Sequence, residues 1–584
     1  MASPFDQDLS TGTPPDVPRH RHSARSAAPS GRFVPSGSRL TALAYAVVVV
    51  PFVYALVRLA TAPSAHLTLA DDLALIDLHV RRALVWKQQL GVFDHSNWNH
   101  PGPTYFYLVS LVYRALGSSV RSLFVGATLL NALAAVACVA VMRRRTTPAR
   151  ALWAAVWVGV LAAVLAAAGP SATTYSESVL GALVSPWNPT VVLFPLLLVV
   201  LLCAGAIDRS GASLVGSLVV GSYVVQTDIS TLPLAAVLIG VTGAVWLVDL
   251  VRNRAEPQPI DPGPRRRTRM LVLAGLVALV LMWLPPIIQQ VTNQPGNMTL
   301  LWRFFTSGQP GQTFGGSMWA VAAAFTVLVA GPGEVMRSIL GGTPMHAAAA
   351  VAVCIVTVAV GVAVVVVSLR QRSRFAVGMG VLTLVGCVAA VIAVDHVVGY
   401  VFGYLVLWAV VLPVASLIAA GTVPVPVWVG PGRTGAGIRL GLCAVAVAVA
   451  VVTCVRVAAI PPLSRASDPR VGRLADLVTP RLPSGGRVAV GDAGAGTVDT
   501  QLIDTEEFIG LVDLLDRDGY HPLVSPFWKA EFGPGYESVG TEPRMVGLST
   551  WTKASPSLPG YVGQVGDMAV TVTEASGRPA PPTH

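Results

Sequence analysis

Two adjacent carboxylates, Asp71 and Asp72, follow closely after the first long apolar run of the chain. Adjacent carboxylates raise each other's pKa, and desolvation near a membrane adds to that effect. One of the two could therefore accept a proton from an attacking hydroxyl group, as a general base does. The alternative is structural, because a helix N-cap followed by an acid in the first helical turn would use the same two residues.

Further polar residues lie in the same segment, 61–102, and in three later loops. The first group comprises His79, Arg81, Arg82, Asp94 and His100. The later loops contribute Asn188, Gln226, Asp228 and Gln290. Carboxylates and amides at the edge of hydrocarbon are costly unless they are paired or face water. If these loops share one face of the protein, they predict a polar cavity there.

The elements that must position these residues are membrane helices. Hydrophobic residues make up 53% of the 584 residues, charged residues only 12%, and the mean hydropathy is +0.64. A soluble protein has about 25% charged residues, so this chain cannot cover a water-facing surface. No clean cleavage site follows the first apolar run, and we therefore expect a permanent helix rather than a signal peptide.

Thirteen apolar runs are candidate spans, and several are short for ~30 Å of hydrocarbon. They cover residues 40–60, 103–117, 121–142, 150–168, 190–207, 211–225, 230–250, 269–287, 317–331, 347–368, 376–394, 397–419 and 440–458. Basic clusters at 143–145, 252–267, 370–374 and 433–439 should be cytoplasmic. If successive helices cross the membrane in alternating directions, all four clusters are cytoplasmic only when two conditions hold. The stretch 103–142 must make one net crossing, and 317–331 must not be a full span. We expect 11 to 13 helices, an odd number, with a cytoplasmic N-terminus.

The chain divides into three regions. Residues 1–38 are rich in Pro, Ser, Arg and His and predict a disordered cytoplasmic tail. Residues 39–460 form the polytopic membrane domain, whose large first outer loop is 61–102. Residues 464–584 predict a small extracytoplasmic α/β domain, with helices at 469–477 and 505–517 and strands at 486–491 and near 522. All six cysteines fall inside apolar runs, so neither disulfides nor a thiolate metal site is indicated.

The net charge of +10 does not indicate a nucleic-acid binder. Most basic residues lie in short clusters between apolar runs or in the tail, and aromatic residues are not interleaved with them. Only three of the 40 basic residues are lysines, which is typical of a high-GC bacterial genome. In the topology that satisfies the basic clusters, all polar loops lie on the outer side. An outward cavity of this kind suits a lipid-linked substrate whose tail stays in the membrane.

At the first loop the sequence resembles the GT-C superfamily of integral membrane glycosyltransferases. The resemblance is to the bacterial branch with protein O-mannosyltransferases and the aminoarabinose transferase. That family has an acidic pair just past the first span, an interfacial helix, and a His/Lys-Pro-Pro element that opens the second span. Here the matching parts are Asp71 and Asp72, a predicted helix at 73–89, and His100-Pro-Gly-Pro. Gly102 stands where the family has the second proline, and Asp72 stands where the family often has Glu. Both aspartates are therefore candidates for the general base.

The resemblance implies an inverting transfer of a sugar from a polyprenyl-phosphate donor to an envelope glycan, lipid or protein, outside the cytoplasmic membrane. One aspartate would deprotonate the acceptor hydroxyl. Cationic groups or hydrogen-bond donors would stabilise the leaving phosphate. The nearest candidates for that role are His79, Arg81, Arg82 and His100. Sugar contacts could come from Gln226, Asp228 and Gln290.

Structural alternatives remain open for these residues. The arginines could contact lipid head groups, the histidines could pack at the interface, and the last three residues could cap helix ends. Some relatives use a divalent metal ion, and the acids here could hold one, but no ligand spacing specifies it.

Two other functions compete with this interpretation. A transporter or flippase for a polar lipid or cell-wall precursor would predict internal repeats and helices broken at the bilayer midplane. The sequence shows no convincing repeat, and its polar residues lie at the outer edge of the runs. A non-catalytic envelope protein with a sensory outer domain would leave the acidic first loop without a role.

Overall fold

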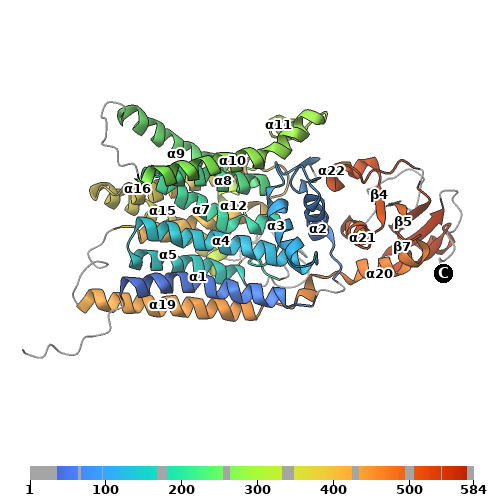
Figure 1. The fold of residues 1–584 in the computed structure, drawn as a ribbon, viewed down its shortest axis with the longest axis horizontal. Helices are drawn as coiled ribbons and strands as arrows, with labels where there is room; N and C mark the ends of the chain where they lie inside the picture. The colour runs from blue at the N-terminus through green and yellow to red at the C-terminus, as the bar shows by residue number, and fades with distance from the viewer. Residues whose placement is uncertain are drawn as a thin grey trace, which may run out of the picture.

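The computed structural model describes residues 36–63, 67–94, 96–167, 180–253, 263–331, 347–423, 433–492, 505–540 and 542–574. Figure 1 shows a bundle of long, roughly parallel helices with a small domain of helices and strands at one end. Nearly all of the predicted N-terminal tail, residues 1–35, lies outside the described residues.

Ten helical segments in the described part of the chain are long and apolar enough to cross a membrane. They are α1 (Gly37–Ala60), α4 (Arg121–Arg145), α5 (Pro148–Leu165), α6 with α7 (Asn188–Val191, Leu193–Ile207), η2 with α9 (Ile229–Thr231, Leu232–Asn253), α10 (Gly263–Thr292), α15 (Ala347–Arg370), α16 (Arg374–Asp395), α17 with η3 and α18 (Gly403–Val406, Leu407–Val410, Val411–Ala420) and α19 (Arg433–Ala458). Shorter apolar segments are α8 (Gly211–Thr227) and α12 with α13 (Phe314–Phe325, Val327–Ala330). The predicted polytopic helical bundle is confirmed.

Each of the thirteen predicted runs contains a helix, but they differ in length. The 103–117 run forms α3 (Thr104–Ala115), whose 12 residues extend only about 18 Å at 1.5 Å per residue. That length cannot cross the hydrocarbon layer alone. The stretch 103–142 therefore contains one helix of spanning length, α4, as the basic clusters require.

Charged side chains connect the helices at one end of the bundle. Arg145 at the end of α4 pairs with Asp208 after α7, at 3.0 Å. Asp249 of α9 pairs with Arg209, at 3.3 Å, and with Arg374 at the start of α16. The C-terminal domain and the α2 helix (Asp71–Leu84) lie at the opposite end (Figure 1). The basic clusters and the polar loops are thus on opposite ends of the bundle.

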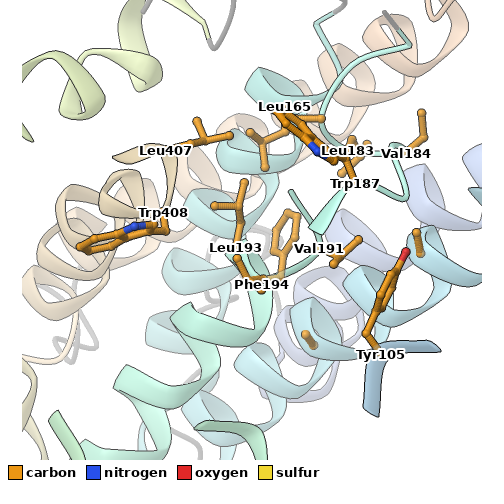
Figure 2. Close-up of a cluster of buried hydrophobic side chains, with 14 of the residues drawn as sticks. Tyr105, Leu165, Leu183, Val184, Trp187, Val191, Leu193, Phe194, Leu407 and Trp408 are labelled. Atoms are coloured by element: carbon orange, nitrogen blue, oxygen red, sulfur yellow. The ribbon is translucent and has the colours of Figure 1, made fainter. Parts of the chain in front are cut away.

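The core of the bundle is centred on α7, which packs against α4, α8, α9, α16 and α18. Figure 2 shows buried side chains that meet around the start of this helix, including Leu193 and Phe194 of α7, Trp187 of the preceding loop, and Leu407 and Trp408 of η3. In contrast, α10 leaves most of its apolar side chains exposed. Lipid tails are as apolar as these side chains, so such a face needs no protein partner.

The interfacial helix predicted at 73–89 is α2, and it ends five residues earlier than expected, at Leu84. The reason is a turn at its C-terminal end. Trp86 has a positive φ of 60°, and the Lys87 N–H returns to the carbonyl of Arg82. This is the geometry of a left-handed helix stop. A short hairpin of β1 (Phe93–Asp94) and β2 (Trp98–Asn99) follows, and α11 (Asn297–Thr306) packs against it.

The C-terminal domain is built on a five-stranded sheet. Its strands are β3 (Arg487–Asp492), β4 (His521–Val524), β5 (Arg544–Thr550), β6 (Tyr561–Val565) and β7 (Met568–Glu574), in the order β4-β3-β5-β7-β6. β3 is parallel to β4 and β5, whereas β7 is antiparallel to both neighbours. Its helices are α20 (Pro469–Val478), α21 (Thr505–Arg517) and α22 (Lys529–Phe532), with short 3-10 turns at η5 (Leu463–Ala466), η6 (Thr479–Arg481), η8 (Pro526–Trp528) and η9 (Ser555–Ser557). The predicted helices and strands of this region all form.

Candidate active site

The acidic pair opens α2, but it does not cap the helix. The N-cap position is Ala70, and no side chain accepts a hydrogen bond there. Asp71 has a φ of 50°, in the left-handed region that few residues other than glycine adopt. Such conformations carry a cost and are often found at functional sites. The acids therefore do not cap the helix, but both lie in its first turn, where a carboxylate interacts favourably with the helix N-terminus, as the structural alternative states.

Asp72 faces the membrane domain. Its Oδ2 atom accepts a 2.7 Å hydrogen bond from the indole N–H of Trp187, in the loop before α6. Burial raises the pKa of Asp72 to about 7, and the charges of Asp71 and Asp94 add to that effect, whereas the bond from Trp187 opposes it. A carboxylate that titrates near neutrality can both exist as the base and take up a proton.

His100 is buried, and only 8% of its surface is exposed. Its Nδ1 atom accepts from the backbone N–H of Ile229, at 3.0 Å, and its Nε2 atom lies 3.2 Å from the side-chain amide of Asn188. Burial lowers the pKa of His100, so the ring is neutral and its proton resides on Nε2. The amide atom at this distance is Nδ2 of Asn188, so the amide must be rotated by half a turn for its oxygen to accept that proton.

A cavity of about 760 Å³ opens beside His100 and Asn188. Asp94 and Asp228 also line it, so four of the predicted site residues meet there. The rest of the described lining is largely aromatic and aliphatic. The aromatic side chains are Trp98, Trp283, Trp302, Phe304, Phe305, Tyr400, Phe402, Tyr404 and Trp408. Apolar walls with a few convergent polar groups are typical of a ligand site.

Trp187 connects the acidic pair to this cavity. Its indole N–H binds Asp72, and its ring packs on Tyr404 with 5.0 Å between centroids. Tyr404 in turn lines the cavity. The aromatic side chains of Trp187 and Tyr404 therefore connect the carboxylate of Asp72 to the cavity.

Three predicted residues of α2 face the C-terminal domain instead. The Nε2–H of His79 donates to the carbonyl of Glu531, at 3.0 Å, and Arg82 donates to the carbonyl of Pro534, at 2.9 Å. Arg81 forms ion pairs with carboxylates of its own helix and of α21. These partners are Asp77, Asp513 and Asp516. The contacts of all three residues dock the C-terminal domain onto α2.

Gln226 and Gln290 make contacts that join helices. The Gln226 carbonyl oxygen accepts from Thr104, at 2.5 Å, and its amide donates to the carbonyl of Met282, so α3, α8 and α10 are tied together. A side chain at Gly102 would begin only 2.4 Å from that same oxygen, which explains why glycine stands where the family has proline. Gln290 accepts from the backbone N–H of Met298 and so caps α11.

Two residues with a clear place in this region were not among the predicted site residues. Trp187 directly precedes the predicted site residue Asn188, but its bond to Asp72 depends on packing that brings positions 115 residues apart together. Glu531 lies in the C-terminal domain, yet its charge interacts with Asp71 and Asp72. No local sequence signal marks Glu531, because its environment is formed entirely by the first loop.

A metal site was left open by the sequence. Within the described ranges, no three or more His, Cys, Asp or Glu side chains form a group that could hold a metal ion.

These features define a polytopic membrane protein in which an acidic helix start and an aromatic cavity share one end of the bundle. Among solved structures, the chain is similar to ArnT from Cupriavidus metallidurans in the apo state, with 12% identity and a TM-score of 0.53. It is also similar to the same protein bound to undecaprenyl phosphate, with 13% identity and a TM-score of 0.50. Each comparison covers 92% of this chain and 98% of the other. No family profile and no curated protein matches the sequence.

Proposed function

We propose that this chain is a membrane glycosyltransferase that moves a sugar from a polyprenyl-phosphate donor to an envelope acceptor, with Asp72 as the general base. The observation that carries the proposal is the contact of Asp72 with Trp187, which packs against Tyr404 of the cavity wall; the pKa of Asp72 is about 7. The chain is similar to ArnT over nearly its full length, and one of the two ArnT structures contains undecaprenyl phosphate. This similarity supports a polyprenyl phosphate as the carrier of the donated sugar.

The cavity supports a donor with both polar and apolar parts. Aromatic faces suit sugar rings and prenyl units, and the polar wall offers His100, Asn188, Asp94 and Asp228 to sugar hydroxyl groups. His100 can donate a hydrogen bond to the donor as a neutral ring, and a second histidine, His396, also lines the cavity. Nδ1 of His396 donates to the carbonyl of Ile392, which leaves its Nε2 for a ligand.

The reaction follows from these groups. Asp72 takes the proton from the acceptor hydroxyl, and the oxygen attacks the anomeric carbon from the face opposite the phosphate. A new carbon–oxygen bond forms as the bond to the phosphate oxygen breaks, and the electron pair leaves with polyprenyl phosphate. Attack from the opposite face inverts the anomeric configuration. Asp71 stands next to the base, and its charge raises the pKa of Asp72.

The proposed location of the active site follows from which end of the bundle carries the basic clusters. The basic clusters lie at the end that contains Arg145 and Arg374, and such clusters remain in the cytoplasm. The cavity and the C-terminal domain are then on the outer face of the cytoplasmic membrane. An acceptor glycan, lipid or protein of the envelope would reach the site from that side.

Sugar transfer measured in proteoliposomes tests the proposal. The purified protein receives a polyprenyl-phosphate sugar and envelope extract, and the D72N variant is compared with D476N, a change at an exposed position of α20. We expect D72N to lose at least about 100-fold in kcat, the size of a general-base contribution, and D476N to retain activity. Full activity of D72N would refute the assigned base. Movement of the labelled lipid across the bilayer without transfer would favour a flippase.

A further inference from the structure

A smaller cavity lies between the ends of α1 and α19, which run side by side in Figure 1. Its volume is about 330 Å³, within the range of small-molecule sites. It shares no lining residue with the cavity of the proposed donor site. Leu59, Val457 and Ile460 are buried side chains of its wall, and Arg58 is the charged residue of the described lining. The cavity thus presents one cation against apolar walls.

The guanidinium of Arg58 is only partly engaged. Its Nη1 atom donates to the carbonyl of Val457, and its Nη2 atom donates to that of Ile460, at 3.1 Å. These two bonds tie the last turn of α1 to the end of α19. A guanidinium has five N–H groups, so three of them have no partner among the described residues. Carbonyls at a helix end carry only partial charges, and the remaining donors suit an anion.

The helices around Arg58 supply no counter-charge. α1 packs against α4, α5 and α19, and none of these four helices contains an Asp or Glu residue. A second cation, Arg121 at the start of α4, donates to the carbonyl of Ala62 in the cavity wall, at 3.3 Å. A positive charge at a helix N-terminus is unfavourable. Neither arginine forms an ion pair within the described ranges, so this place on the molecule is locally cationic.

The cavity opens at the edge of the membrane domain. Arg143 of the first basic cluster donates to Thr41 near the start of α1, so Arg58, in the last turn, lies at the opposite end of the bundle. The helix faces beside the cavity are apolar and open, because Val57 is 54% exposed and Val455 is 61% exposed. Such faces contact lipid chains in a membrane. A ligand of this cavity therefore meets a cation at the depth of the head groups and an apolar surface below it.

We propose that this cavity binds the phosphate group of an anionic phospholipid, with Arg58 as its ligand and one acyl chain along the exposed faces of α1 and α19. The planar guanidinium matches the oxygen atoms of a phosphate, and basic pockets between membrane helices bind anionic head groups. The inference goes beyond the proposed function, because it concerns a separate cavity and does not depend on sugar transfer.

A bound lipid would touch segments that lead to the active site. Pro63 of the cavity wall begins the connection to α2, Val184 lies three residues before Trp187, and Ser464 lies in the turn that leads to the C-terminal domain. The phosphate would therefore stabilise the place where these three segments leave the bundle.

Native mass spectrometry of the full-length protein, released from phosphatidylcholine nanodiscs, measures the binding of phosphatidylglycerol. We expect R58Q to bind this lipid about 10- to 100-fold more weakly than the wild type, the size of one lost hydrogen bond to a charged group. The wild type should bind phosphatidylcholine more weakly, because its choline cation cancels the charge of the phosphate. The A62F variant fills the cavity and keeps both Arg58 and the carbonyl at position 62. It should also lose the tight binding, and it decides the question where R58Q does not fold.

R456Q is the matched control. Arg456 is an exposed cation in the last turn of α19 and does not line the cavity, so this variant should bind phosphatidylglycerol as the wild type does. If R58Q or A62F folds and retains the wild-type affinity, the inference is wrong. Equal affinity of the wild type for the two lipids would also overturn it, because the site then does not recognise negative charge. Displacement of the lipid by inorganic phosphate at the same concentration would show a site for a free anion instead.

Discussion

The proposed chemistry depends on the hydrogen bond from the indole N–H of Trp187 to the carboxylate of Asp72. The indole N–H is the group that opposes the upward shift of the pKa of Asp72, because it stabilises the ionised carboxylate. A hydrogen bond to a charged group contributes about 1.5–3 kcal/mol. The bond from Trp187 is therefore strong enough to decide whether the base is ionised at neutral pH.

The W187F variant tests this contact. Phenylalanine keeps a ring against Tyr404 but removes the donor, so the pKa of Asp72 should rise further, from about 7 to about 8. A base is active when ionised, so the acidic limb of the pH–rate profile should move to higher pH. Activity should fall about tenfold at pH 6.5 and recover at pH 8.5. A uniform loss at all pH values would mean that Trp187 only supports packing.

At the scale of elements, α2 joins two parts of the molecule. Asp72 contacts Trp187 of the membrane domain, whereas His79, Arg81 and Arg82 contact the C-terminal domain. Asp72 and His79 lie on the same side of the helix, and Arg81 lies on the opposite side. Arg81 pairs with three carboxylates.

The R81A variant should loosen the docking of the C-terminal domain. Asp77 and Asp513 are at most 1% exposed, and loss of their cation would leave two buried charges, which costs about 3–5 kcal/mol. Limited proteolysis at pH 7.5 should release the C-terminal domain from R81A much faster than from R81K, which keeps the charge. Asp513 already has a raised pKa through burial and the charge of Asp77. Without Arg81 that pKa rises again, so lowering the pH should protonate Asp513 and restore the docking. Equal proteolysis of R81A and R81K at both pH values would contradict the assignment.

At the scale of the whole molecule, the sequence predicts the bundle and the small domain well. Runs of apolar residues determine where helices form in a membrane, because every backbone group must be paired within its own segment. The local order of residues also predicts the acidic pair and His100 as candidate site residues. The partners of Arg81 and the place of Glu531 could not be found in this way, because both depend on how α2 packs against residues more than 400 positions later.

Cysteine labelling in cells tests which end of the bundle faces the cytoplasm. Charged residues at the ends of α4, α7 and α9 predict which side is cytoplasmic. We expect a cysteine at exposed Arg144 to react with a membrane-impermeant maleimide only after the cells are permeabilised. A cysteine at exposed Lys553 of the C-terminal domain should react in intact cells. The native cysteines lie in apolar helices, and a variant without them removes their background. Labelling of position 144 in intact cells would place the cavity in the cytoplasm, where envelope acceptors are absent, and the proposed reaction could not take place as described.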